Sequence, residues 1–321
     1  MTNPLESQVH LRPVRPETDF PAIVSLINCF DSVPTTLEQV EKNYKFMPEG
    51  RIVRRTMAVD ANDDVIGYGV AAHETWFPAG EYYVLVLVDP AWRGRGTGTR
   101  LYADTLDFLH EQGAVSLKSE VKDEDELSMR FARRYGYDID RHIFESELDL
   151  TAFDESPYAG LIPRLEAEGF RFVSLADLGD TTEARRGLYQ VNHDAVLDIP
   201  GYVGDWFTFD QFQELVCGSH WYRPDGQFGV LDGETWAGIA AVQLLGDQKL
   251  AYNLFTGVMR PYRGRKLALA LKLVAIRYAL AHGMQRMRTD NDSLNGPMLA
   301  VNRKLGYIPE PGKYFIRTRL S

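Results

Sequence analysis

Glycine and arginine alternate in a short segment, Arg93 to Gly98, that follows an apolar, β-rich run. Glycine lets a backbone adopt positive φ angles and come close to a ligand. The helical pattern that follows would point its first N–H groups, at the positive end of the helix dipole, into this turn. The segment therefore predicts an anion site suited to a pyrophosphate. The candidate binding residues are Leu87, Val88, Arg93, Gly94, Arg95, Gly96, Thr97 and Gly98.

The turn recurs at a constant offset of 170 residues, the difference between Tyr82 and Tyr252. Gly136-Tyr137 corresponds in the same way to Gly306-Tyr307, with no insertion or deletion in between. So long a match in register indicates two tandem copies of one domain. In the second turn a lysine replaces the middle glycine. The candidate binding residues of this copy are Val258, Arg263, Gly264, Arg265, Lys266, Leu267 and Ala268.

Two other phosphate-binding motifs fit the first turn less well. A dinucleotide-binding fingerprint would need a glycine where Thr99 stands, although Glu120 ends the next apolar run, roughly where a ribose-binding acid is found. A P-loop would need a Gly-Lys-Ser or Gly-Lys-Thr sequence, which does not follow the turn. A glycine turn with solvated arginines and no ligand is the remaining alternative for either copy.

The turn and the strand before it resemble the GNAT superfamily of N-acetyltransferases. The coenzyme A signature of that family is Arg or Gln, two residues, Gly, one residue, then Gly or Ala. Arg93, Gly96 and Gly98 satisfy it, whereas Lys266 of the second copy departs from it. The resemblance covers both halves of the chain. It implies an α/β fold with a mixed sheet, in two tandem acyl-CoA N-acyltransferase domains that form a pseudo-dimer.

The resemblance also implies a reaction. An amine attacks the thioester of acetyl-CoA directly, without an acyl-enzyme, and backbone N–H groups of the strand before the turn (83–88 and 253–258) bind the thioester carbonyl. A primary amine with a pKa near 10 is only about 0.1% free base at neutral pH, a handicap of roughly 4 kcal/mol that a general base would relieve. In tandem relatives, asparagines equivalent to Asn291 and Asn302 lie near the coenzyme.

The catalytic candidates are Glu81, Tyr82 and Tyr252. Many relatives use a tyrosine as the acid, but its two positions hold Ala132 and Asn302 here. Tyr82 and Tyr252 occupy equivalent strand positions where some relatives carry a catalytic glutamate, and Glu81 is adjacent. Cross-strand packing with a satisfied hydroxyl is the alternative for both tyrosines.

Each copy is expected to form a hairpin, then strand, turn, helix, strand, helix and strand. The turns at 62–64 and 232–233 predict the two hairpins. The apolar helix 267–282 is expected to be more deeply buried than its counterpart. A segment rich in proline and glycine, 151–164, predicts domains at 1–150 and 165–321. An aromatic cluster could line an acceptor pocket or belong to the core: Tyr202, Trp206, Phe207, Phe209 and Phe212.

Composition limits the possible partners. The 321 residues fit two ordinary domains, and a net charge of −10 argues against nucleic acid and anionic membranes. The two cysteines, Cys29 and Cys217, make neither a metal site nor a disulfide framework. Because there is no basic, apolar leader and no run of about 18 to 20 apolar residues, we expect a cytoplasmic protein without a membrane segment.

The sequence therefore predicts an acetyl-CoA-dependent N-acetyltransferase that modifies a primary amine of a small molecule or peptide. We expect no metal, and a pseudo-dimeric monomer or a homodimer. A non-catalytic acyl-CoA sensor or scaffold is the alternative, which the missing tyrosines permit. The acceptor does not follow from the sequence, since fold does not determine function.

Overall fold

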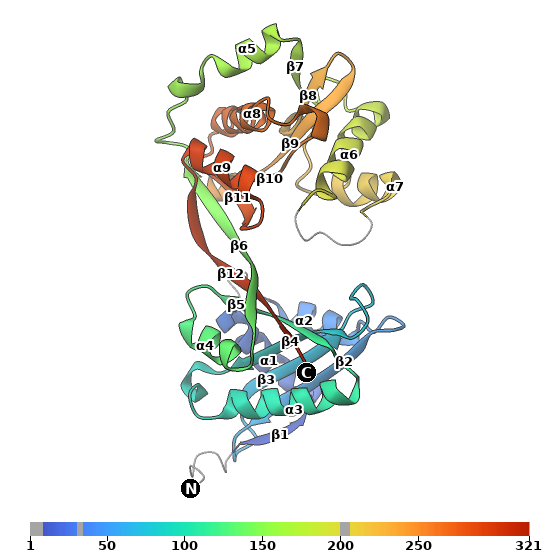
Figure 1. The fold of residues 1–321 in the computed structure, drawn as a ribbon, viewed down its shortest axis with the longest axis vertical. Coiled ribbons are helices and arrows are strands. Elements are labelled where there is room, and N and C mark those ends of the chain that lie inside the picture. Colours follow the sequence, from blue (N-terminus) through green and yellow to red (C-terminus); the bar gives the residue numbers. More distant parts are fainter. Residues whose placement is uncertain (1–8, 31–34, 200–205, 321) are drawn as a thin grey trace. The chain divides into compact units, whose positions relative to one another are not determined.

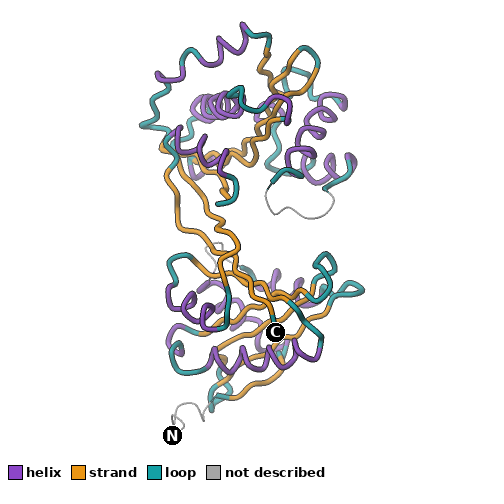
Figure 2. The backbone as a smooth tube through the Cα atoms, viewed as in Figure 1, coloured by secondary structure: helices purple, strands orange, loops and turns teal. Residues whose placement is uncertain are grey.

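The computed structural model describes residues 9–30, 35–199 and 206–320, and its elements repeat along the chain as the sequence predicts (Figure 1). Close packing divides the chain into two compact units, residues 1–140 with 313–321 and residues 141–312. Each unit contains both strands and helices (Figure 2). Across the described ranges, no helix has both the length and the apolar character needed to cross a membrane.

The first unit has a mixed sheet with the strand order β1-β2-β3-β4-β5-β12. Neighbouring strands run antiparallel except β4 and β5, which α3 connects as a parallel pair. Its elements are β1 (His10–Pro13), α1 (Pro16–Phe30), α2 (Leu37–Lys45), β2 (Ile52–Val59), β3 (Val65–His73), β4 (Glu81–Val88), α3 (Thr97–Glu111), β5 (Ser116–Lys122), α4 (Glu126–Arg134) and the end of β12 (Ile308–Arg319).

The second unit repeats this arrangement in the order β7-β8-β9-β10-β11-β6. Here β10 and β11 form the parallel pair, and the expected hairpin is β8 and β9. Its elements are β6 (Asp138–Asp149), α5 (Leu161–Ala167), β7 (Phe170–Ser174), α6 (Thr182–Val196), α7 (Phe209–Phe212), β8 (Gln227–Asp232), β9 (Thr235–Leu245), β10 (Leu250–Val258), α8 (Leu267–Ala281), β11 (Arg286–Asp292) and α9 (Gly296–Leu305). The predicted mixed α/β class and both hairpins are confirmed.

The last strand of each sequence copy belongs to the sheet of the other copy. Residues Lys313–Arg319 of β12 pair with β5, and residues 143–149 of β6 pair with β11. The two ladders have the same register, because Lys313 lies opposite Lys122 while Ile143 lies opposite Asp292, each shifted by the repeat. Packing therefore divides the chain at other places than the predicted limits of 1–150 and 165–321, which remain a prediction about the sequence repeat.

Helices cover both faces of the sheet in the first unit. Tyr82 and Val84 of β4 pack in one hydrophobic cluster with residues of α3, whereas Leu87 packs in another with residues of α1 and α2. This alternation follows from the two-residue period of a strand. Strand β4 is thus buried on both faces and holds its position firmly.

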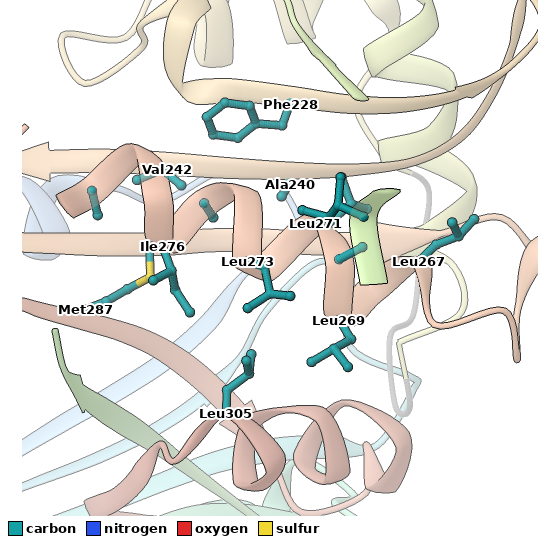
Figure 3. Close-up of a cluster of buried hydrophobic side chains, with 14 of the residues drawn as sticks. Phe228, Ala240, Val242, Leu267, Leu269, Leu271, Leu273, Ile276, Met287 and Leu305 are labelled. Atoms are coloured by element: carbon teal, nitrogen blue, oxygen red, sulfur yellow. The ribbon is translucent and has the colours of Figure 1, made fainter. Parts of the chain in front are cut away.

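In the second unit, α8 is buried more completely than α3, as predicted. It has nine buried residues against five in α3, because α5 and α9 cover the side that the sheet leaves open. Figure 3 shows side chains of α8 among Phe228 and Val242 of the sheet and Leu305 of α9. A helix with apolar residues on all sides needs such complete cover.

The exchanged strand should be essential to the stability of the first unit. The Ile316 side chain is 2% exposed in the core between β5 and α3, so Ile316→Ala is expected to lower the free energy of unfolding by about 2–4 kcal/mol. Hydrogen exchange should locate the loss in the first unit, including the amides of β5. Ile308→Ala on the same strand is the control, because Ile308 is 68% exposed and its removal should cost about 0.5 kcal/mol or less. Equal effects of the two substitutions would contradict the assignment of β12 to this core.

Candidate functional site

The two glycine-rich turns have the same backbone conformation. Gly94 and Gly264 have φ angles of 73° and 80°. Gly96 has φ 87° and ψ −11°, and Lys266 at the equivalent position has φ 67° and ψ 16°. Lysine thus adopts the left-handed conformation that glycine adopts in the first copy, at some cost in strain. The departure of Lys266 from the signature does not alter the path of the turn.

The helix after each turn begins without a side-chain cap. The first helical hydrogen bonds are donated by Arg100 N–H to Gly96 O, at 3.0 Å, and by Ala270 N–H to Lys266 O, at 3.1 Å. The preceding N–H groups at each helix end therefore have no partner within the helix, and the positive end of the helix dipole lies behind them. Both turns present the backbone donors that an anion such as a phosphate requires.

The signature arginines are occupied by the protein itself. Arg93 donates from Nε to Val88 O (3.2 Å) and from Nη1 to Asp125 Oδ2 (2.9 Å). Arg263 likewise donates to Val258 O (3.0 Å) and forms an ion pair with Asp198. These contacts fix the turn against the end of the preceding strand. The same bonds hold the backbone that carries the N–H donors, and binding of the coenzyme by Arg93 and Arg263 remains a prediction.

In the second unit, a further ion pair holds the turn against the end of the preceding strand. Arg260 also pairs with Asp198, and its hydrogen bond, together with that of Arg263, lowers the pKa of Asp198 to about 2. Asp198 follows α6, so α6 is tied to the second turn. The other two turn arginines lie over aromatic rings, Arg95 over Trp92 at 5.3 Å and Arg265 over Phe170 at 4.6 Å.

The parallel strands of each unit separate soon after they begin. Pairs between β4 and β5 end at Tyr83 with Lys118, and pairs between β10 and β11 end at Tyr252 with Arg288. The following residues of both strands line a pocket instead. In the second unit a bulge between Asn253 and Phe255 accompanies the separation. One edge of β4 and of β10 thus offers backbone groups to a ligand.

The pocket of the first unit has a volume of about 790 Å³. Its walls are the separated strand ends, the turn, and residues of α3 and α4. Among the predicted binding residues, Leu87, Val88, Arg93, Gly94, Gly96 and Gly98 line it. Arg95 and Thr97 do not. A Cβ on Gly98 would meet Val88 and Phe131 at 3.6–3.9 Å, an ordinary contact, which explains why Ala268 fits the equivalent position.

The pocket of the second unit has a volume of about 960 Å³ and the same construction. The predicted residues Val258, Arg263, Gly264, Lys266, Leu267, Ala268 and Asn291 line it. Arg265 and Asn302 do not. Asn302 is buried behind the wall and donates to Asn291 Oδ1 at 2.7 Å, and Asn291 donates to Ser146 Oγ at 2.8 Å. The two predicted asparagines are therefore neighbours, but only Asn291 reaches the pocket.

Carboxylates stand at equivalent positions in the two pockets, Glu120 on β5 and Asp290 on β11. Tyr252 Oη lies 2.9 Å from Asp290 Oδ1 and 2.9 Å from Glu145 Oε1. Partial desolvation, together with the charge of Glu145, raises the pKa of Asp290, and burial raises that of Tyr252. The phenol therefore keeps its proton and holds a carboxylate that faces the pocket. Glu120 is paired with Lys313 at 3.0 Å.

The predicted catalytic residues of the first copy lie apart from its pocket. Glu81 is buried at the start of β4, where it pairs with Lys118 and Arg317. Tyr82 packs in the core against α3, and burial raises its pKa. Tyr252, the third candidate, does not line the second pocket but contacts Asp290, which does. Within each unit the candidates thus lie at the end of β4 or β10 that is still paired with the parallel neighbour.

Several pocket residues were not identified from the sequence. Tyr102 of α3 lines the first pocket and lies 3.3 Å from Tyr137 Oη, and Lys272 of α8 occupies the equivalent position in the second. The position of Lys272 within a mostly apolar helix could have indicated that this lysine is buried. Nothing local indicated Asp198, whose contacts are 62 and 65 residues distant. Of the aromatic cluster, Phe212 is in the core and Phe207 is exposed, and Tyr202 lies outside the described residues.

Solved structures share this two-unit architecture over nearly the whole chain. A GCN5-related N-acetyltransferase from Sphaerobacter thermophilus has a TM-score of 0.64 at 19% identity, covering 99% of this chain and 97% of that one. A tandem GNAT protein from the clavulanic acid biosynthesis pathway has a TM-score of 0.62 at 20% identity, covering 97% and 98%. At such identities the likeness shows the fold.

Sequence comparison identifies the family. An uncharacterized protein of Mycobacterium leprae (strain TN) is 35% identical over 77 residues, which are 24% of this chain and about a fifth (21%) of that protein. The model of the acetyltransferase (GNAT) family matches twice, at residues 20–137 and 197–307, and the two matches contain the two pockets' turns. They cover well over half of the chain. The protein is therefore a member of the GNAT acetyltransferase family that carries two tandem domains.

Proposed function

We propose that the protein transfers the acetyl group of acetyl-CoA to a primary amine of a small molecule or peptide, by direct attack in a ternary complex. One observation carries the proposal: in each unit, an uncapped helix N-terminus and the open edge of a strand meet in one pocket. The first group suits the pyrophosphate of a coenzyme, and the second suits an extended arm with amide groups and a thioester.

In this proposal each part of the pocket has a defined task. The N–H groups that follow Gly96 and Lys266 bind the pyrophosphate. The free edge of β4 or β10 holds the arm, and its N–H groups polarise the thioester carbonyl as negative charge develops on the oxygen. The acetyl group then lies near the point where the parallel strands separate. The amine approaches from the opposite strand, which carries Glu120 or Asp290.

We propose Asp290 and Glu120 as the proton acceptors, in place of Glu81 and Tyr82. Both carboxylates line pockets, whereas Glu81 is enclosed by Lys118 and Arg317. Because the pKa of Asp290 is raised, it lies closer to the pKa of the ammonium group that Asp290 must deprotonate, directly or through water. Tyr252 would act as a positioning residue, because it contacts the carboxylate of Asp290.

A non-catalytic acyl-CoA sensor is the second candidate, and one observation favours it. Ala132 and Asn302 stand where many relatives have an acidic tyrosine, and neither side chain can protonate a thiolate. Thiol release from acetyl-CoA in the presence of a broad panel of amines distinguishes the two functions. A sensor binds the thioester and releases no thiol with any amine, whereas an acetyltransferase releases it with at least one class.

Charge at the turns should decide coenzyme binding. Gly96→Asp places a carboxylate beside the uncapped N–H groups, and aspartate tolerates a positive φ. We expect it to weaken acetyl-CoA binding at the first site at least tenfold, or about 1.4 kcal/mol. Lys266→Asp should do the same at the second site. Calorimetric titration should give two sites per chain in the wild-type protein and one in either variant.

Asparagine variants provide the matched controls. Gly96→Asn and Lys266→Asn adopt the same conformation without the charge, and should retain most of the affinity. If the asparagine variants lose as much as the aspartate variants, charge is not the cause. Thiol release measured on the same proteins then assigns turnover to the first unit, the second, or both. No binding of acetyl-CoA to the folded wild-type protein would overturn the proposed function.

Removing the pocket carboxylates should slow the chemical step. We expect Asp290→Asn to reduce turnover at the second site about 100-fold, and Glu120→Gln to do so at the first. Because the pKa of Asp290 is raised, the acidic limb of the kcat/KM profile should lie above the usual aspartate range and vanish in Asp290→Asn. Unchanged turnover in both variants would return the role to Glu81, Tyr82 or Tyr252, to be examined by Glu81→Gln, Tyr82→Phe and Tyr252→Phe.

A further inference from the structure

A buried amine distinguishes the second pocket from the first. Lys272 of α8 lines the pocket and is only 1% exposed. Its Nζ donates to Asn253 Oδ1 at 2.7 Å and lies 5.1 Å from the centre of the Tyr307 ring. Both contacts are with uncharged groups. Burial lowers the pKa of Lys272 to about 7, which reflects how poorly this environment supports a positive charge.

No carboxylate within the described ranges forms an ion pair with Lys272, although three line the same pocket. Asp198 is paired with Arg260 and Arg263, Asp290 contacts Tyr252, and Asp292 is paired with Arg141 at 3.2 Å. Each of these acids thus has a partner of its own. A buried lysine normally has an acidic partner or a chemical task, because its desolvation is expensive.

Lys272 stands where the two parallel strands separate. Asn253, its hydrogen-bond partner, is at the bulge of β10, one residue after the last pair with β11. Thr289 Oγ1 of β11 donates to Asn253 O of β10 at 3.0 Å, so this hydrogen bond joins the two strands where their pairing ends. The phosphate-type turn lies at the other end of the same strand, after Val258. A ligand whose anionic end occupies the turn would therefore present its far end to Lys272.

The tyrosine beside Lys272 has further hydrogen-bonding capacity. The Oη atom of Tyr307 is buried and has no partner among the described residues. A buried hydroxyl without a partner costs free energy, and this one lies next to Lys272 without lining the pocket itself. At the equivalent place in the first pocket, the hydroxyl groups of Tyr102 and Tyr137 lie within 3.3 Å of each other, and no buried amine is present there. The two pockets thus differ at the end that lies away from the turn, although their turns have the same conformation.

We infer that the second pocket takes a ligand with a carboxylate at its buried end, whose negative charge is placed on Lys272. The inference rests on the proposed function for the use of the pocket by a coenzyme A thioester. The carboxylate has two possible sources: the acyl group of the donor, or an acceptor that is an amino acid. Either forms an ion pair with Lys272 that none of the protein's described carboxylates supplies.

Matched pairs of ligands separate the two sources. For the donor, succinyl-CoA is compared with butyryl-CoA, which has the same chain length and no terminal carboxylate. For the acceptor, glycine is compared with glycinamide, titrated into protein saturated with coenzyme A. Binding is measured by calorimetry in a Gly96→Asp background, which restricts the thioester to the second pocket. We expect the carboxylate member of one pair to bind at least about tenfold more tightly.

Lys272→Met, of similar length and uncharged, should abolish that preference. Lys45→Met is the control for total charge, since Lys45 is 74% exposed in the other unit, and should preserve it. A measurement on the protein with Lys272 intact is independent of both variants. At pH 8 the Lys272 amine of the ligand-free protein is mostly neutral. When a carboxylate binds, Lys272 should therefore take up a proton, and the heat of binding should depend on the buffer.

The possible outcomes distinguish a failure of this inference from a failure of the proposed function. If neither thioester binds in this background, the second pocket takes no coenzyme A thioester and the inference fails. The proposed function fails as well only if acetyl-CoA does not bind to the wild-type protein. If both thioesters bind equally, glycine and glycinamide do not differ, and no proton is taken up, the role of Lys272 is refuted while the proposed function stands. A preference for succinyl-CoA or for glycine that disappears in Lys272→Met supports the inference and identifies the source of the carboxylate.

Discussion

The separation of two parallel strands after only three paired residues is the constraint on which both sites depend. In a regular sheet, the backbone groups of β4 beyond Tyr83 would be consumed by β5. Because the strands diverge, those groups remain available along one edge, and side chains of the opposite strand reach the same space. The turn then adds unbonded N–H groups at the far end. A ligand with a charged head and an extended polar arm matches this sequence of features.

Keeping the strands apart requires support on all other sides. β4 is buried on both faces by α1 and α3, and from Tyr83 to Val88 it is paired with β3 on its other edge. The arginine of each turn bonds to the last carbonyl of the strand, so the turn cannot drift away from the sheet. The antiparallel partner of β5 is β12, and that of β11 is β6. These contacts hold the strands while the pocket between them stays open.

Much of this was predictable from the sequence because it is encoded locally. Positive φ at Gly94 and Gly96, the start of α3 and the two hairpins all follow from residues within a few positions of one another. The extent of burial of α8 followed from its apolar composition. The role of the turn arginines did not follow, because Asp125 and Asp198 are distant in the sequence. The burial of Lys272 did not follow either, because it depends on elements distant in the sequence that cover α8.

The exchange of the last strands was beyond sequence reasoning for a different reason. At the offset of the repeat, β6 and β12 are equivalent, and each satisfies the same register against β5 or β11. An alternation of apolar and polar residues predicts that a strand will pair, but it does not predict which of two equivalent sheet edges the strand will pair with. Only the connection of the whole chain decides between them.

This exchange sets an order for folding on the ribosome. Domains usually complete their folding as soon as their residues emerge, beginning at the N-terminus. Here the sheet of the N-terminal unit lacks its outer strand until residues 313–319 have been translated, when the second unit has already been synthesised. Until then β12 does not cover the edge of β5, and this edge is open to pairing with other strands. The unit that is synthesised first is thus the last to be finished.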